Sequence, residues 1–394
     1  MLMISDGKFP PQMSKSCKVR ALLAYWILGL CNNYGYVVML TAAHDIINGY
    51  LPNTTEDHSN NARNCTLMST GAILLADVVP ALIVKFLAPF LPFFVHIRVA
   101  ICVIFAIGGF LLVSLSNTMI LALLGVILTS FVNGLGEVTF LQYSSFYDKN
   151  VVSSWSSGTG GAGVIGSISY SALHIIGMRL ALQIMLIVPI AMALAFWWLL
   201  PKPMGLLDVQ KQVNANDLEN PKEALKYKLR LIPGLLKYII PFSLVYLFEY
   251  FINQGTFELV NFPDTFVDQK GQYRWLQVCY QVGVLISRSS VNLFHIRQIW
   301  VLAVLQFLNV IIYTTEVIYF YIPSFYVMIF LTIWEGLLGG SAYVNTYYTI
   351  SMEVPEEDKQ FSMAITGFGD SIGISLAGLF AMWFHNKICD LPLP

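Results

Sequence analysis

Residues 133–140 read Asn133-Gly-Leu-Gly-Glu137-Val-Thr-Phe, and residues 155–166 read Trp155-Ser-Ser-Gly-Thr-Gly-Gly-Ala-Gly-Val-Ile-Gly166. An amide, a carboxylate and a run of glycines thus stand inside segments that are otherwise apolar enough to be buried in lipid. The bilayer core holds no water, so every backbone polar group there must be satisfied within the protein. These stretches predict membrane-spanning helices that pack closely and carry functional polar groups.

The glycines at 158, 160 and 163 match the G-x-G-x-x-G spacing of dinucleotide sites. That motif needs a preceding β-strand and an acidic residue about 20 positions later, whereas here a serine-rich turn comes first and Arg179 and Gln183 follow. Small residues also recur at every fourth position, as at Gly158, Ala162 and Gly166. This spacing lets two transmembrane helices approach closely, so we interpret the run as a helix-packing motif.

The composition indicates a polytopic membrane protein whose main partner is the lipid bilayer. Of the 394 residues, 56% are hydrophobic and only 11% are charged, against about 25% charged in soluble domains. The net charge of -1 gives no basic excess, so nucleic acid is not an expected partner. The six cysteines lack C-x-x-C spacing and predict neither a disulfide framework nor a metal site. Hydrolase motifs are missing as well, and we expect no enzyme and no cofactor.

Apolar windows of about 20 residues, the length that crosses a bilayer, predict eleven spans. They lie near 20–47, 67–87, 98–116, 119–143, 156–177, 180–200, 237–260, 275–294, 299–321, 325–350 and 362–386.

Basic residues orient the spans, because loops rich in Lys and Arg stay on the cytosolic side. A cytosolic N-terminus places 17 of the 22 Lys and Arg residues on that side. It also places both glycosylation sequons, at Asn53 and Asn64, on the first luminal loop. The odd number of spans then predicts a luminal C-terminus.

The polar, Lys-rich segment 201–236 is the one marked shift in composition and divides the chain into two bundles. The predicted units are a cytosolic tail (1–19), a six-helix bundle (20–200), a cytosolic linker (201–236), a five-helix bundle (237–388) and a luminal tail (389–394).

The second bundle repeats features of the first. Asn253-Gln254-Gly255 in span seven matches Asn32-Asn33-Tyr-Gly35 in span one, and Glu335 with its following glycines in span ten matches the Glu137 region in span four. Span eleven is rich in glycine, like span five. The common order and direction predict parallel repeats related by an axis along the membrane normal.

With these motifs in view, the chain resembles the battenin family, lysosomal membrane proteins related to major facilitators and more distantly to equilibrative nucleoside transporters. The matching stretches extend over nearly the whole chain and include Leu28–Asn33, Val37–Ile46, Gly134–Phe140, Ser154–Gly163, Glu249–Gly255, Ser287–Ser290 and Glu335–Gly340. The resemblance implies a major-facilitator-like, all-α fold in late endosomal and lysosomal membranes. It also implies a role in clearing glycerophosphodiesters, and so in lysosomal homeostasis and pH.

Ionisable groups at membrane depth cost roughly 2.5–3.5 kcal/mol each and usually mark a transport path or a proton relay. The amides and acids fall on spans one, four, seven and ten, which normally line the cavity of facilitators. Together with two residues of span eight they form the predicted substrate site: Asn32, Asn33, Tyr36, Glu137, Glu249, Asn253, Gln254, Tyr280, Arg288, Glu335, Tyr343 and Asn345. The proton-coupling candidates are Asp77, Glu137, Glu249 and Glu335.

Other interpretations of these residues remain open. Arg288 could clamp a phosphate through its two-point guanidinium fork, or it could be a span end that snorkels to the surface. Glu249 and Glu335 could be proton sites or could join the two bundles through a structural ion pair or hydrogen bond. The amides could form bonds between helices, and tyrosines are also common at membrane interfaces.

The leading hypothesis is an alternating-access transporter that moves a small anionic phosphodiester from the lysosomal lumen to the cytosol. The alternatives are a carrier of cationic amino acids or nucleosides, and a scaffold that recruits trafficking proteins through the 201–236 linker.

Overall fold

The computed structural model describes residues 15–50, 70–202, 221–263, 265 and 269–391. Within these ranges the chain is helical and contains no β-strand, as expected where the backbone must satisfy its own hydrogen bonds in lipid. Asn53 and Asn64 lie outside the described residues, as do positions 203–220 of the predicted linker.

The first half of the chain contains six helical stretches. Five are α1 (Lys15–Tyr50), α2 (Thr70–Leu87) with the 3-10 turn η1 (Ala88–Phe90), α3 (Val95–Leu115), α4 (Met119–Ser144), and α5 (Asn150–Leu173) with the turn η2 (His174–Ile176). The sixth is interrupted and consists of α6 (Met178–Ile184), α7 (Ile187–Leu194) and the π-helical η3 (Ala195–Leu199).

The second half contains five stretches. The first is α9 (Pro221–Phe251), which continues through the π-helical η4 (Ile252–Thr256) and the short η5 (Phe257–Leu259). The others are α10 (Gln269–Arg288), α11 (Ile299–Tyr319), α12 (Phe325–Glu353) and α13 (Glu356–Cys389). Residues 221–236 of the predicted linker are therefore the first turns of α9, which starts with a proline, a residue favoured at the first helical position.

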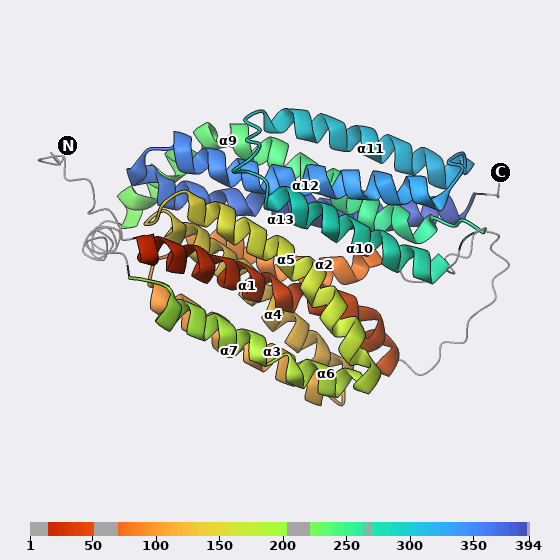
Figure 1. Cartoon of the computed structure of the whole chain (residues 1–394), viewed down its shortest axis with the longest axis horizontal. Helices are drawn as coiled ribbons and strands as arrows, with labels where there is room; N and C mark the ends of the chain where they lie inside the picture. Colours follow the sequence, from red (N-terminus) through yellow and green to blue (C-terminus); the bar gives the residue numbers. More distant parts are fainter. Residues whose placement is uncertain (1–14, 51–69, 203–220, 264, 266–268, 392–394) are drawn as a thin grey trace, which may run out of the picture.

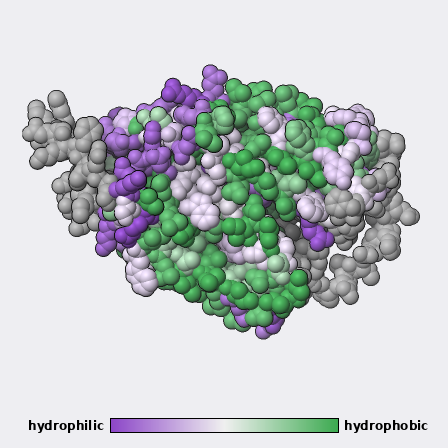
Figure 2. All heavy atoms as spheres, viewed as in Figure 1, coloured by the Kyte–Doolittle hydropathy of each residue, from purple (hydrophilic) through white to green (hydrophobic). Residues whose placement is uncertain are grey.

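The prediction of eleven helices is confirmed, since each predicted span corresponds to one of these stretches. Among the described residues, eight helices are long and apolar enough to cross a membrane. Figure 2 shows an apolar surface over the middle of the bundle and hydrophilic residues gathered at the end where α1 begins. The apolar belt is the surface that lipid would cover.

The helices run side by side, and α1 begins at the opposite end of the bundle from the end of α13 (Figure 1). The two halves meet where α5 packs against α10 and α2 packs against α13. Within the first half, α1 packs closely along α5. The glycine-rich helix therefore contacts both its own half and the other one.

Close approach of α1 and α5 explains the glycine motif. A Cβ atom at Gly158 would collide with the Trp26 carbonyl of α1, and one at Gly29 would lie 2.5 Å from the Trp155 carbonyl of α5. On the other side of α5, a Cβ at Gly163 would collide with the Gln281 side chain of α10. The run is thus a helix-packing motif.

Gly158→Ala should destabilise the protein by about 1–3 kcal/mol, the usual cost of overpacking, because the obstructing atoms are backbone and cannot rotate away. Thermal unfolding of the detergent-purified chain measures the loss. Gly234→Ala is the matched control, since no heavy atom lies within 4 Å of a Cβ there. Equal melting temperatures for the two variants would contradict the packing.

Candidate functional site

A buried ammonium group joins the two halves. Lys85, in the last turn of α2, is only 3% exposed. Its Nζ lies 2.6 Å from Oε2 of Glu137 in α4 and 2.9 and 3.0 Å from the carboxylate oxygens of Asp370 in α13. Glu137 belongs to the same half as Lys85, and Asp370 belongs to the other. One cation is therefore shared by two carboxylates across the interface between the halves.

A serine inserted into α2 sets the position of Lys85. The Ser130 hydroxyl of α4 donates to the Asp77 carbonyl and accepts the Ala81 N–H at 3.2 Å, replacing one rung of the helical ladder beside Pro80. Insertion of a side chain into the ladder is a recognised cause of helix bending. Gly134 of α4 leaves room for the Ala81 backbone, 2.9 Å from where a Cβ would lie. These contacts hold α2 on α4 one turn before Lys85.

Tyr343 of α12 connects the lysine cluster to a second cation. Its hydroxyl donates to Oε1 of Glu137 at 2.8 Å and accepts from the Trp155 indole of α5 at 3.0 Å. The Arg288 guanidinium lies over the Tyr343 ring, 4.1 Å from its centroid. Tyr343 thus lies between the two cations: its hydroxyl bonds to Glu137, the partner of Lys85, and its ring contacts Arg288.

Arg288, the last residue of α10, turns into the interface between the halves. Nη1 donates to the Thr159 hydroxyl of α5 at 2.7 Å, and Nη2 donates to the Tyr246 hydroxyl of α9 at 3.0 Å. Its buried Nε has no hydrogen-bond partner. Among the described residues, no carboxylate pairs with Arg288. These inward contacts argue against the alternative in which Arg288 snorkels to the membrane surface.

These residues form one connected network, which we call the interface network: Lys85, Glu137, Trp155, Thr159, Tyr246, Arg288, Tyr343 and Asp370. The interface network lies toward the end of the bundle where α1 begins. Lys85 and Arg288 stand in the last turns of α2 and α10, and both helices finish at that end.

Further contacts between the halves lie at the same end. The Ser157 and Ser289 hydroxyls are 2.9 Å apart, and the Phe90 and Phe361 ring centroids are 5.5 Å apart. The structure is therefore closed at this end, which the distribution of basic residues predicts to face the cytosol.

Two other predicted acids lie together inside the second half. The Tyr280 hydroxyl donates to Glu249, whose other oxygen is buried without a hydrogen-bond partner. Both carboxylate oxygens of Glu335 in α12 are likewise buried and unpartnered. Gly339 leaves room for the Glu249 carboxylate, which a Cβ there would strike. Neither acid forms an ion pair or hydrogen bond with the first half in the described structure.

The remaining predicted residues are spread over both halves. Asn32 donates to the Asn133 carbonyl at 3.1 Å and to Asn33 at 3.4 Å, so this amide pair ties α1 to α4. Asn345 accepts the Ile296 N–H at 2.7 Å and supports the turn before α11.

The four other candidates lie on α1, α2 and η4. Tyr36 stands on α1 and Asp77 is buried in α2, while Asn253 and Gln254 are buried in the π-helical turn η4. Tyr36 lies beside the interface network, because it interacts with Tyr250 of α9 and electrostatically with Asp370.

Comparison with known proteins assigns the chain to a family. The sequence profile described as CLN3 protein matches residues 23–226 and 203–391. Battenin from Canis lupus familiaris is 40% identical over 415 aligned positions, covering 97% of this chain and 94% of battenin. Protein BTN1 from Yarrowia lipolytica is 35% identical, covering 93% and 94% of the two chains. The chain belongs to the CLN3 family.

Solved structures identify the fold of this CLN3-family chain. The human organic anion transporter MFSD10 superposes with a TM-score of 0.67 at 9% identity, covering 94% of this chain and 96% of that one. The proton:xylose symporter XylE gives 0.64 at 13% identity, with coverages of 95% and 90%. The predicted major-facilitator-like fold is confirmed.

Sequence reasoning selected Glu137, Arg288 and Tyr343 but omitted Lys85 and Asp370 from the site. A lysine near a span end resembles any snorkelling residue, and a lone aspartate in a glycine-rich span shows no partner. The sequence feature that could have predicted this pair is a lysine on span two together with an acid on span eleven, since opposite charges buried in lipid need each other as partners. No feature of the sequence marked the neutral residues Trp155, Thr159 and Tyr246 as members of the site.

Removing the shared cation should unfold this CLN3-family protein more readily than removing an exposed one. Lys85→Met leaves two carboxylates buried without their partner, which costs about 3–5 kcal/mol. The triple variant Lys85→Met/Glu137→Gln/Asp370→Asn removes the charges together and should recover much of that loss. Thermal unfolding in detergent measures both.

Lys237→Met is the control for this series. Lys237 is exposed and lies 3.7 Å from Glu353, so its loss should cost at most about 1 kcal/mol. A Lys85→Met variant as stable as the Lys237→Met variant would contradict a buried, paired lysine.

Proposed function

We propose that this CLN3-family protein is an alternating-access transporter of late endosomal and lysosomal membranes that exports glycerophosphodiesters from the lumen to the cytosol. The proposal rests on family membership and the major facilitator fold. The substrate class is the one that the family resemblance implies, and the chemistry of Arg288 supports it. We further propose a cytosolic N-terminus and glycosylation at Asn53 and Asn64 on the luminal side.

The observation that carries the proposal is a guanidinium, between the two halves, that has only neutral hydrogen-bond partners. Arg288 gives one N–H bond to Thr159 and one to Tyr246, and its Nε is left unpartnered. A guanidinium has five N–H donors in a planar fork that matches a phosphate in two-point geometry. A phosphodiester carries one negative charge and would supply the anion that this cation lacks.

The neighbouring hydroxyls suit the rest of such a substrate. Tyr246 and Tyr343 surround Arg288, and the Trp155 indole adds a fixed donor nearby. These groups can donate to and accept from the hydroxyls of a glycerol head. The hydroxyls of Thr159 and Tyr246 are neutral acceptors, and a guanidinium binds a phosphate oxyanion more strongly than a hydroxyl, so a charged ligand can compete with them.

The positions of Lys85 and Arg288 suit a change between a closed and an open state of the interface between the two halves. Lys85 has one partner in its own half, Glu137, and one across the interface, Asp370. Arg288 likewise has Tyr246 in its own half and Thr159 across the interface. Opening the closed end breaks the contacts across the interface and keeps those within each half. Neither cation is then left alone in the membrane, which lowers the cost of switching.

Glu249 and Glu335 are our proposed proton sites, with Asp77 and Glu137 as further candidates. Glu249 and Glu335 are buried and lack an ion-pair partner in the described structure. A carboxylate in that setting is placed to bind and release a proton during transport, as a carrier working between an acidic lumen and the cytosol would require.

The same unpaired carboxylates favour a second candidate, a carrier of cationic amino acids, since a cation could pair with Glu249 or Glu335. Competition separates the two functions. An excess of unlabelled glycerophosphodiester should block uptake of the labelled compound, whereas lysine or arginine should not. Block by the amino acids alone would favour the second candidate.

Purified protein in vesicles should take up a labelled glycerophosphodiester above the level of protein-free vesicles. Arg288→Lys should raise the half-saturating concentration by about 10- to 150-fold, the equivalent of a lost charge-assisted bond of roughly 1.5–3 kcal/mol, because Lys lacks the planar fork. Arg297→Lys, at an exposed loop position, is the control. Absence of uptake at every pH tested would overturn the proposal.

Glu249→Gln and Glu335→Gln should each abolish the stimulation of uptake by a pH gradient, because an amide cannot carry the proton. Exchange of substrate at equal pH should persist. Glu357→Gln, at an exposed position of α13, should leave both rates unchanged. Gradient stimulation that survives the loss of both acids would exclude them as proton sites.

A further inference from the structure

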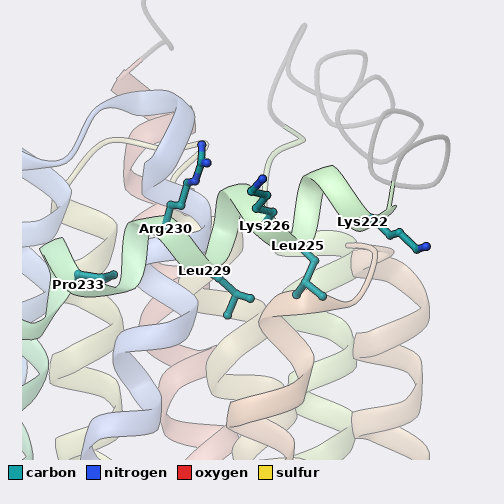
Figure 3. Close-up of a pocket in the computed structure, with 6 residues that line it drawn as sticks. All are labelled: Lys222, Leu225, Lys226, Leu229, Arg230 and Pro233. Atoms are coloured by element: carbon teal, nitrogen blue, oxygen red, sulfur yellow. The ribbon is translucent and has the colours of Figure 1, made fainter.

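The first turns of α9 carry an outward face that no other helix of the described residues covers. Lys222, Leu225, Lys226, Leu229, Arg230 and Pro233 recur at intervals of three and four residues, so they share one side of the helix. They line a shallow groove of about 480 Å³ (Figure 3). We call these six residues the α9 outer face.

The α9 outer face separates apolar from cationic groups. Figure 3 shows Leu225 and Leu229 directed to one edge of this face, toward the body of the bundle, and Lys226 and Arg230 directed to the other edge. The two leucines are 46% and 50% exposed, so about half of each side chain is left uncovered. Within the described ranges the basic residues of this face make no ion pair.

The opposite side of the same helix is bonded to α12 and α13. The Tyr227 hydroxyl donates to Oδ1 of Asp358 at the start of α13 at 2.6 Å. Eleven residues further along α9, the Tyr238 hydroxyl donates to Glu353 at 2.6 Å. The helix is therefore held in place from one side only, and the orientation of the α9 outer face is set by these bonds.

We propose that the α9 outer face binds an anionic membrane surface, with acidic phospholipid headgroups on the basic residues and the two leucines inserted at the boundary with the acyl chains. The face holds three cations and no acid. It immediately precedes the first span of the second half, at the end where α1 begins. Amphipathic helices with basic polar sides bind at this depth, and basic segments beside a span attract acidic lipids.

A label on the Leu229→Cys variant of the full chain reports the environment of the face. The protein is placed in nanodiscs of phosphatidylcholine with increasing phosphatidylserine, and quenching of a fluorophore by a quencher attached to the lipid chains is measured. The signal of the labelled parent protein is subtracted, since Cys17 and Cys279 are partly exposed. Quenching should rise with the phosphatidylserine fraction and fall when salt is raised from about 0.1 to 0.5 M, as screening increases.

Lys222→Gln/Lys226→Gln/Arg230→Gln in the same labelled protein should weaken this response. Each basic side chain near an anionic surface strengthens binding roughly fivefold, so losing three should shift the phosphatidylserine titration by tenfold or more, up to roughly 100-fold. Lys15→Gln/Lys18→Gln/Lys202→Gln, exposed positions outside the face, remove equal charge and should not shift it.

Two results would overturn the proposal. Strong quenching that is equal in phosphatidylcholine and in phosphatidylserine would indicate apolar insertion without recognition of charge. A label that stays exposed to water at every phosphatidylserine fraction would place the face away from the membrane and leave it to a soluble acidic partner.

Discussion

The ammonium group of Lys85 lies between two carboxylates that belong to opposite halves of the bundle. Burying an ion is costly, and only good geometry with further hydrogen bonds repays the desolvation. Glu137 receives a bond from Tyr343, and Asp370 receives one from Ser371 at 2.8 Å. The positions of α2, α4, α12 and α13 are all constrained by the need to satisfy this one cation.

The need to pair Lys85 also explains why a serine and a glycine of α4 lie against α2. The serine inserted beside Pro80 and the glycine opposite Ala81 bring α2 against α4, so that the lysine reaches Glu137 without leaving the protein interior. The ring of Tyr343 then contacts the Arg288 guanidinium, which links Arg288 to the same set of contacts. Each of the two cations has one partner in its own half and one in the other, so the closed end can open without leaving either cation without a hydrogen-bond partner.

Much of this fold is predictable from sequence, because span length and hydropathy are local properties. All eleven stretches were foreseen, and the small residues of α5 were correctly assigned to helix packing, where Gly158 meets the α1 backbone. The site was only partly predictable. Glu137 and Arg288 stand out as ionisable groups in apolar segments.

The rest depends on pairing between distant spans, which hydropathy does not encode. Lys85 is indistinguishable from a snorkelling span end until Asp370 is placed beside it. Asn32 and Asn345, which stay predictions as substrate ligands, bond to backbone groups of their own halves in this structure. A single chain gives no signal that separates an amide used for packing from one that faces a ligand.

The most direct measurement is a cross-link between the halves at the closed end. The Ser157 and Ser289 hydroxyls are 2.9 Å apart, so the paired variant Ser157→Cys/Ser289→Cys should form a disulfide under mild oxidation. The oxidised protein should stop transporting and recover when it is reduced, while each single variant transports in both conditions. Cross-linked protein that transports at the uncross-linked rate would show that the closed end does not open, and would contradict alternating access through the interface network.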